Sequence, residues 1–185
     1  MFIGCAGVLI AAFLTEVPEP LRARLAPTNE TAGAFVQEKR LASGETFVSK
    51  GVYAIRPGAD FTWRTLEPFE TVFTTTQSEY VYSNEDEVVR RPLKDLPGFA
   101  KFAALPSGDF SGFFDAFDAL YKEEPEGVFH VLAKPKVARL KRALSRIDLD
   151  GDPTNLVLRA TLADETLFTV RMTDAASPSA DAICH

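Results

Sequence analysis

The sequence predicts an α+β domain in which one antiparallel, strongly curled sheet is covered on its concave side by short helices. Stretches rich in Val, Ile, Thr, Tyr and Phe form two sets, one between residues 46 and 91 and one between 128 and 172. Tight turns join them, which favours antiparallel pairing. Between the sets the apolar spacing changes to that of a helix. Because a large antiparallel sheet must curl, close or cover its concave side, this helical segment is the expected cover.

Composition limits the function classes before any motif is considered. The chain has 185 residues, enough for one domain (1–185), and neither a Gly/Ser linker nor a long repeat divides it. The net charge of −6 and the pI of about 5.0 argue against nucleic acid as a partner, since phosphate binding needs a basic stripe. They also argue against constitutive binding to anionic membranes.

Residues 16–39 are expected to be helical with interruptions, because Pro18, Pro20 and Pro27 break the segment. The residues expected to face inward are Leu21, Leu25, Phe35 and Val36. Five short strands follow, at residues 46–56, 61–66, 69–76, 80–83 and 88–91.

Two helices are expected between the strand sets, at residues 96–105 and 110–117. The second carries four phenylalanines at helical spacing i, i+3, i+4 and i+7, namely Phe110, Phe113, Phe114 and Phe117. Asp109 is the expected N-cap. Because Gly112 lowers the helix propensity by about 1 kcal/mol, this helix needs something for its Phe face to cover.

The second strand set is expected at residues 128–133, 143–149, 156–162 and 167–172, with one helical turn at 137–141. Asp150-Gly151 predicts a hairpin turn. In the last strand Phe168, Val170 and Met172 are expected to face inward. Residues 175–185 are expected to form a flexible tail.

The two ends of the chain leave alternatives open. Residues 1–14 are mostly apolar and too short to cross a bilayer, so they are interpreted either as a signal-peptide remnant or as the first helix of the domain. Cys5 and Cys184 are interpreted either as a disulfide between the chain ends or as two unrelated thiols.

The aromatic content is unusual, with 15 Phe against 4 Tyr and 1 Trp. Phe buries a large area without requiring a hydrogen-bond partner, so this bias indicates either a Phe-rich core or an apolar ligand.

No constellation of catalytic or metal-binding residues is visible. The two histidines are His130, expected in the core or on the surface, and His185. Asp148, Asp150 and Asp152 resemble the start of a calcium loop, but Pro153 stands where that loop needs glycine. We therefore expect no catalytic residue, no metal and no cofactor.

Residues 33–93 carry a resemblance to a known family. The segment AFVQEK at 34–39 precedes SKGVYAIRPG at 49–58, which FTW at 61–63 and a Glu-Pro pair at 67–68 follow. Later, residues 128–135 form a strand that ends beside a basic residue and a proline. In the order and spacing of these features the chain resembles the outer-membrane lipoprotein carrier (LolA-like) family, as a divergent branch.

The resemblance implies an incomplete β-barrel of about eleven strands with a lid of short helices. Its apolar concavity would accept the acyl chains of lipoproteins. The protein would be a periplasmic, non-enzymatic monomer that receives its load from an inner-membrane release complex and delivers it to an outer-membrane receptor. In the family an arginine of the Arg-Pro element bonds to the lid. Arg56 matches it by position, and the alternative is an ordinary surface arginine at a strand end.

The turn at residues 76–79 departs from the family pattern, which has S-D-G-K there. The cargo therefore stays open between an acylated lipoprotein and another glycolipid or polyene lipid. The residues expected to bind it are Phe35, Phe47, Trp63, Phe73, Tyr80, Phe99, Phe113 and Phe117. Two further hypotheses are a membrane-attached acceptor of the same fold and a small lipid-modifying enzyme. A buried polar pair beside a cavity would favour the enzyme.

Overall fold

The computed structural model describes residues 12–13, 16–57, 60–76, 78–92 and 110–175. The strands in the first part of the chain are β1 (Ala12–Phe13), which lies at the edge beside β8, and β2 (Thr31–Arg40), β3 (Thr46–Arg56), β4 (Asp60–Glu67), β5 (Thr71–Thr75), β6 (Glu79–Ser83) and β7 (Val88–Pro92), which form one half of the sheet. The second half consists of β8 (Phe117–Glu123), β9 (Phe129–Pro135), β10 (Leu144–Gly151), β11 (Asn155–Leu162) and β12 (Leu167–Asp174). The helices are α1 (Glu19–Leu25), α3 (Ser111–Ala116), α4 (Ala138–Lys141) and the short 3-10 helix η3 (Pro125–Gly127).

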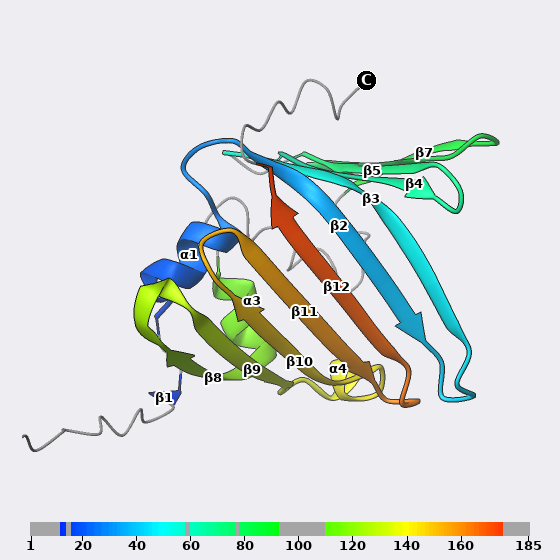
Figure 1. The fold of residues 1–185 in the computed structure, drawn as a ribbon. Coiled ribbons are helices and arrows are strands. Elements are labelled where there is room, and N and C mark those ends of the chain that lie inside the picture. Colours follow the sequence, from blue (N-terminus) through cyan, green and yellow to red (C-terminus); the bar gives the residue numbers. More distant parts are fainter. Residues whose placement is uncertain (1–11, 14–15, 58–59, 77, 93–109, 176–185) are drawn as a thin grey trace, which may run out of the picture.

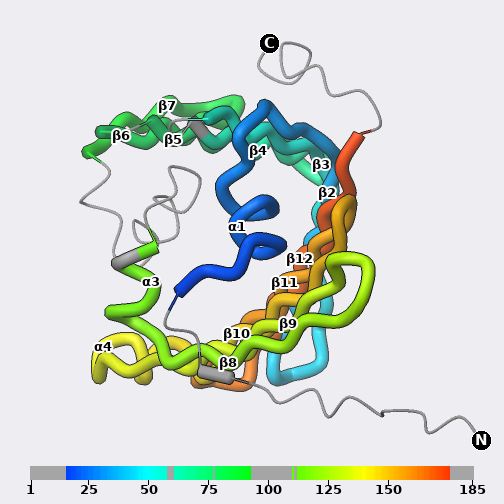
Figure 2. Tube along the Cα trace, turned by 90° about the vertical axis from the view of Figure 1, so that its left-hand side faces the viewer, coloured from blue at the N-terminus to red at the C-terminus, as the bar shows by residue number. Residues whose placement is uncertain are grey.

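These strands form one antiparallel sheet of twelve in the order β1-β8-β9-β10-β11-β12-β2-β3-β4-β5-β6-β7. The sheet curls without closing, so its two ends face each other across a concave space in which α1 lies (Figures 1 and 2). The expected α+β class and incomplete barrel are therefore confirmed. The strand count exceeds the expected eleven because the two-residue β1 pairs with the edge of β8.

The prediction of a helical segment reaching residue 39 is wrong for its second half. Only α1 is helical, and β2 is a ten-residue strand between β12 and β3. Phe35 pairs with Met172 and is buried, whereas Val36 is 37% exposed on the other face. This alternation has the period of a strand, and pairing on both sides satisfies the backbone of β2.

The helix expected at residues 110–117 is shorter than predicted. The N-cap of α3 is Phe110 and not Asp109, and no side chain bonds to its free N–H groups. Phe117 is the first residue of β8, where it pairs with Pro135. Strand pairing with β9 thus takes the fourth phenylalanine out of the helix. The helix predicted at 96–105 lies outside the described residues.

The first strand set also differs in one detail, because Phe69 lies outside β5 and is 78% exposed. In the second set, the predicted turn at Asp150-Gly151 is wrong. Gly151 still pairs with Leu156 inside the ladder, and residues 152–154 form the connection. There Asp152 accepts the backbone N–H groups of Thr154 and Asn155, each at 2.8 Å, so its carboxylate and not the glycine shapes the turn.

Gly151 serves packing instead of chain reversal. A Cβ atom at this position would lie 2.2 Å from Cζ of Phe129, whose ring is fully buried. Phe129 belongs to the main core between the sheet, α1 and α3, together with Phe113, Phe117 and residues of β8 to β11. The absence of a side chain at 151 therefore allows the largest ring of β9 to enter the core.

An ion pair attaches α1 to the sheet. Nη1 of Arg24 donates to both carboxylate oxygens of Asp174 in β12, at 2.9 and 2.7 Å. The hydroxyl of Tyr53 in β3 donates to the same carboxylate. The Arg24 side chain is only 7% exposed and that of Asp174 19%, so this is a largely buried pair. Leu21, one turn earlier on α1, is buried in the core beside it.

We expect Gly151→Ala to lower the free energy of unfolding by about 1–3 kcal/mol, because the added methyl group must displace the ring of Phe129. Equilibrium unfolding in urea measures this loss. Combining it with Phe129→Leu should make the two losses less than additive, since the smaller side chain relieves the clash. A G151A protein with an unchanged urea midpoint would contradict this account.

We expect Asp174→Ala to cost about 3–5 kcal/mol, because it leaves the buried charge of Arg24 without its partner. Asp174→Asn, which keeps an acceptor oxygen but not the charge, should cost less. The matched control is Arg90→Ala, which breaks the exposed Arg90–Glu79 pair and should change stability by less than about 1 kcal/mol. Equal losses for the D174A and R90A variants would show that the pair does not hold α1.

Candidate functional site

A cavity of about 680 Å³ lies between α1, α3 and the concave face of the sheet. This volume falls within the range of about 300–1,000 Å³ that small-molecule sites occupy. Twenty-two residues line it, and the side chains among them that carry a polar atom besides the thioether of Met172 are Arg24, Gln37, Tyr53 and Trp63. The cavity is thus an apolar compartment with very few hydrogen-bonding groups.

The strands β10, β11 and β12 supply a mainly aliphatic part of the lining. Because successive side chains of a strand point to opposite faces, each of these strands sends every second residue into the cavity. These residues are Ile147 and Leu149 from β10, Leu156, Leu158 and Ala160 from β11, and Phe168, Val170 and Met172 from β12. The inward face that the sequence predicts for β12 is therefore the one that lines the cavity.

The other half of the sheet supplies aromatic side chains to the lining, with Phe61, Trp63 and Phe73 on β4 and β5. Trp63 stacks on Phe35, with ring centroids 3.6 Å apart and planes at 21°. Phe35 occupies the space above Gly51, where a Cβ atom would lie 2.7 Å from its ring. Because Gly51 has no side chain, the Phe35 ring can pack close to the backbone of β3 and stack on Trp63.

Helices α1 and α3 form the remaining wall. From α1 and the segment that precedes it come Val17, Leu21, Arg24 and Leu25, and from the N-cap and body of α3 come Phe110, Phe113 and Phe114. The guanidinium of Arg22 lies 5.6 Å from the ring centroid of Phe110, so a cation–π contact joins the two parts of this wall.

The structure brings together part of the predicted ligand-binding set. Trp63, Phe73 and Phe113 line the cavity. Phe35 and Phe117 are buried next to the lining, where Phe35 stacks on Trp63 and Phe117 stacks on Phe113 at 5.1 Å. These two rings support the lining without belonging to it.

The other predicted residues lie elsewhere. The ring of Tyr80 lies 5.9 Å from that of Phe73 and is not part of the lining. Phe47 is 55% exposed near the start of β3. Phe99 lies outside the described residues. Arg56, the predicted lid latch, forms an ion pair with Glu30 at 3.5 Å, and its latch role stays a prediction.

Sequence reasoning missed most of the lining because it selected aromatic residues. The alternation in β11 places its aliphatic side chains on one face, and Leu21 and Leu25 have the i, i+4 spacing of one helical face. These signals could have added them. No local signal marks Arg24, because its partner Asp174 is 150 positions away.

The polar groups at the cavity suit binding better than acid–base chemistry. Burial, and then the hydrogen bond to Asp174, raise the pKa of the Tyr53 phenol well above its usual value, so it stays neutral near pH 7. Arginine does not release its proton in proteins. Within the described part of the chain, none of the 22 lining residues is a Ser, Thr, Cys, His, Lys, Asp or Glu, so these residues supply neither a nucleophile nor a general base.

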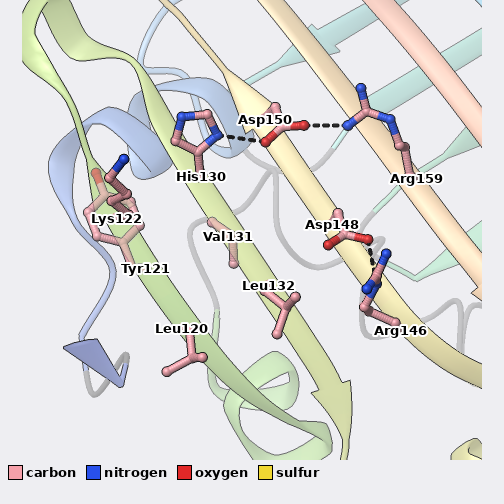
Figure 3. A pocket seen from close by; sticks show the side chains of 10 residues that line it. All are labelled: Leu120, Tyr121, Lys122, His130, Val131, Leu132, Arg146, Asp148, Asp150 and Arg159. Carbon is pink, nitrogen blue, oxygen red and sulfur yellow. Dashed lines mark hydrogen bonds and ion pairs between the residues drawn. The ribbon is translucent and has the colours of Figure 1, made fainter. Parts of the chain in front are cut away.

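A second, open hollow of about 450 Å³ lies on the other face of β8 to β11. Figure 3 shows His130 bonded to Asp150, which is paired with Arg159. The distance from His130 Nδ1 to Asp150 Oδ1 is 2.7 Å. Partial burial of Asp150 opposes ionisation, but the bonds from His130 and Arg159 outweigh it and lower the pKa of this carboxyl.

A histidine held by a carboxylate could act as a base, but it needs a nucleophile or substrate group beside it. The ten residues of the hollow include no Ser, Thr or Cys. His130, Asp150 and Arg159 are each about 40% exposed, so we interpret this group as a solvated charge network on the sheet surface.

Two further observations concern the described part of the chain alone. No helix there is long and apolar enough to cross a membrane. In the same residues, no group of three or more His, Cys, Asp and Glu side chains is arranged to hold a metal ion.

Comparison with known proteins returns structural likenesses only. No family model matches the chain, and no curated protein matches it. Among solved structures, the chain is similar to a LolA superfamily protein from Nitrosomonas europaea, with a TM-score of 0.47 and 7% identity over 90% of this chain and 95% of that one. It is also similar to a DUF1329 family protein from Desulfovibrio piger, with a TM-score of 0.45 and 11% identity over 89% and 93% of the two chains.

The fold of this chain is defined by its own strand pairing, and its candidate site is defined by the cavity.

Proposed function

We propose that this protein is a non-enzymatic lipid carrier that holds an acyl chain in the cavity between α1, α3 and the concave face of the sheet. The observation that carries the proposal is the size of the cavity, about 680 Å³, together with its almost wholly apolar lining. Each acyl CH₂ group moved from water into such a site contributes roughly 0.8 kcal/mol. An acyl chain therefore gains enough from the cavity to leave water.

Water is a poor occupant of the same space. A buried water molecule needs two to four polar partners, and long stretches of the lining on β10, β11 and β12 offer none. An acyl chain needs no polar partner and adapts its shape to an irregular apolar space. The mixture of branched aliphatic and aromatic side chains around the cavity is suited to such a ligand.

Transport between two membranes follows as the proposed role of binding. A carrier must take up and release its load, and the wall formed by α1 and α3 consists of two short helices of seven and six residues. Such short helices have little stability of their own, so their contacts with the sheet hold the wall in place, and we propose that uptake and release of the load open these contacts. The resemblance of residues 33–93 to lipoprotein carriers supports a periplasmic protein that meets an inner-membrane release complex and an outer-membrane receptor.

The alternative of a lipid-modifying enzyme has one observation in its favour, the buried polar group of Arg24, Asp174 and Tyr53 beside the cavity. Its chemistry does not suit catalysis. The carboxylate is occupied by Arg24 and Tyr53, the raised pKa of the phenol keeps it neutral, and the arginine stays charged. These groups suit the attachment of α1 and the binding of a ligand oxygen better than proton transfer.

The cavity is tested by filling it. Leu158→Trp places a large ring in the cavity and should weaken the binding of a fluorescent fatty-acyl probe about tenfold or more, which corresponds to about two lost CH₂ contacts. Val157→Trp is the matched control. Val157 is the neighbour of Leu158 on β11, but it is absent from the cavity lining and pairs with Asp150, which lies at the hollow on the other face. Probe binding is followed by fluorescence titration, and the fold by circular dichroism.

Unweakened probe binding by the L158W protein, with V157W as tight as the wild type, would place the ligand outside this cavity. A wild-type protein that fails to bind the probe would contradict the carrier function itself.

A further inference from the structure

One buried donor at the cavity has no acceptor. Arg24 uses Nη1 for both bonds to Asp174, while its Nε–H has no hydrogen-bond partner among the residues that the structure describes. The side chain is 7% exposed and contributes to the cavity lining. Unpaired donors are rare in buried positions because they lose their bonds to water without replacement. The N–H itself is covered by neighbouring side chains, but Arg24 lines the cavity, so a bound ligand that shifts this side chain slightly can bring an acceptor to the donor.

The charge at this place is already balanced. The positive charge of Arg24 is neutralised by Asp174, to which Tyr53 also donates. Among the lining residues that the structure describes, Arg24 is the only charged one. A free carboxylate entering the cavity would bring a net negative charge into apolar surroundings, which is costly. A neutral carbonyl oxygen accepts one hydrogen bond without adding charge, so it fits the spare donor better.

The position of Arg24 suits the polar end of an acyl group. Its partner Asp174 is the last residue of β12, and Met172, Val170 and Phe168 follow in turn along the cavity side of that strand. From Met172 to Phe168 the strand spans about 13 Å. A chain whose carbonyl lies at Arg24 can therefore extend along β12 over apolar side chains.

We propose that Nε of Arg24 donates a hydrogen bond to the carbonyl oxygen of an acyl ester or amide, so that the cavity prefers neutral acyl derivatives to free fatty acids and to plain alkanes. This inference rests on the proposed function, since it assigns the ligand class of the same cavity. Gln37, the other polar aliphatic side chain in the lining, pairs with Val170 farther along the sheet and marks a separate position.

The test compares ligands that share one chain and differ at its end. Methyl palmitate, N-methyl palmitamide, palmitic acid and an alkane of matching length each compete with a fluorescent probe bound to the wild-type protein. We expect the ester or the amide to bind about tenfold more tightly than the alkane, as one hydrogen bond from a charged donor provides. The stronger of the two indicates whether the natural ligand is an ester-linked lipid or an amide-linked acyl group.

Two variants assign the donor. Arg24→Lys keeps a positive charge opposite Asp174 but has no N–H group at the Nε position, so the ratio between the affinities for the carbonyl compounds and for the alkane should fall to about twofold or less. The matched control Gln37→Met should keep the preference. On the wild-type protein, the Nε–H resonance of Arg24, assigned in a nitrogen-15 spectrum by its loss in R24K, should shift with the ester or amide but not with the alkane.

Three outcomes would overturn the inference while the carrier function stands. Palmitic acid could bind more tightly than the ester, neither carbonyl compound could be preferred to the alkane, or the preference could be lost in Q37M but kept in R24K. An unchanged Nε–H resonance of Arg24 would do the same, and the comparison of the ligands on the wild-type protein needs no variant. If neither the alkane nor any other chain bound the wild-type protein, the proposed function would fall together with the inference.

Discussion

The ion pair between Arg24 and Asp174 decides where α1 lies, and the cavity depends on that position. A helix of seven residues is not stable alone in water, so α1 must be held by tertiary contacts. Leu21 supplies apolar contact with the core, but such contact has no direction. The two bonds from Arg24 fix the helix at one end of β12, so that it stands inside the curled sheet and leaves space beside it.

The curvature of the sheet divides its concave face into a filled and an open part. Toward β8 and β9, the rings of Phe113, Phe117 and Phe129 fill the space as core. Toward β12 and β4, side chains such as Phe61 line a space that they do not fill. The many phenylalanines therefore form both a core and an apolar cavity wall. Amino-acid composition alone could not predict which rings belong to the core and which to the wall.

Much of the fold could be predicted from the sequence because local patterns agree with it. The alternation in β3 and β12 and the single turn of α4 lie where their patterns place them. The failures are places where pairing overrides local preference. The last residues of β2 continue a segment with a helical pattern, and β8 contains Ala, Leu, Lys and Glu, which favour helices. The cavity was predicted through its aromatic residues, whereas Arg24 and Asp174 meet only in three dimensions.

Arg24 both positions α1 and carries the unpartnered Nε–H donor. The position of α1 on the sheet is therefore linked to the binding of a ligand. On the proposed function, a carbonyl bonded to Nε adds a contact to the side chain that anchors α1, so the loaded cavity holds its wall more firmly than the empty one. Because coupling is reciprocal, a partner that moves α1 away from the sheet weakens ligand binding by the same free energy by which the ligand stabilises the position of α1. A receptor that binds the exposed parts of α1, or competes for Asp174, would thereby release the load without entering the cavity. A carrier needs such an arrangement, because tight burial of an acyl chain would otherwise prevent delivery.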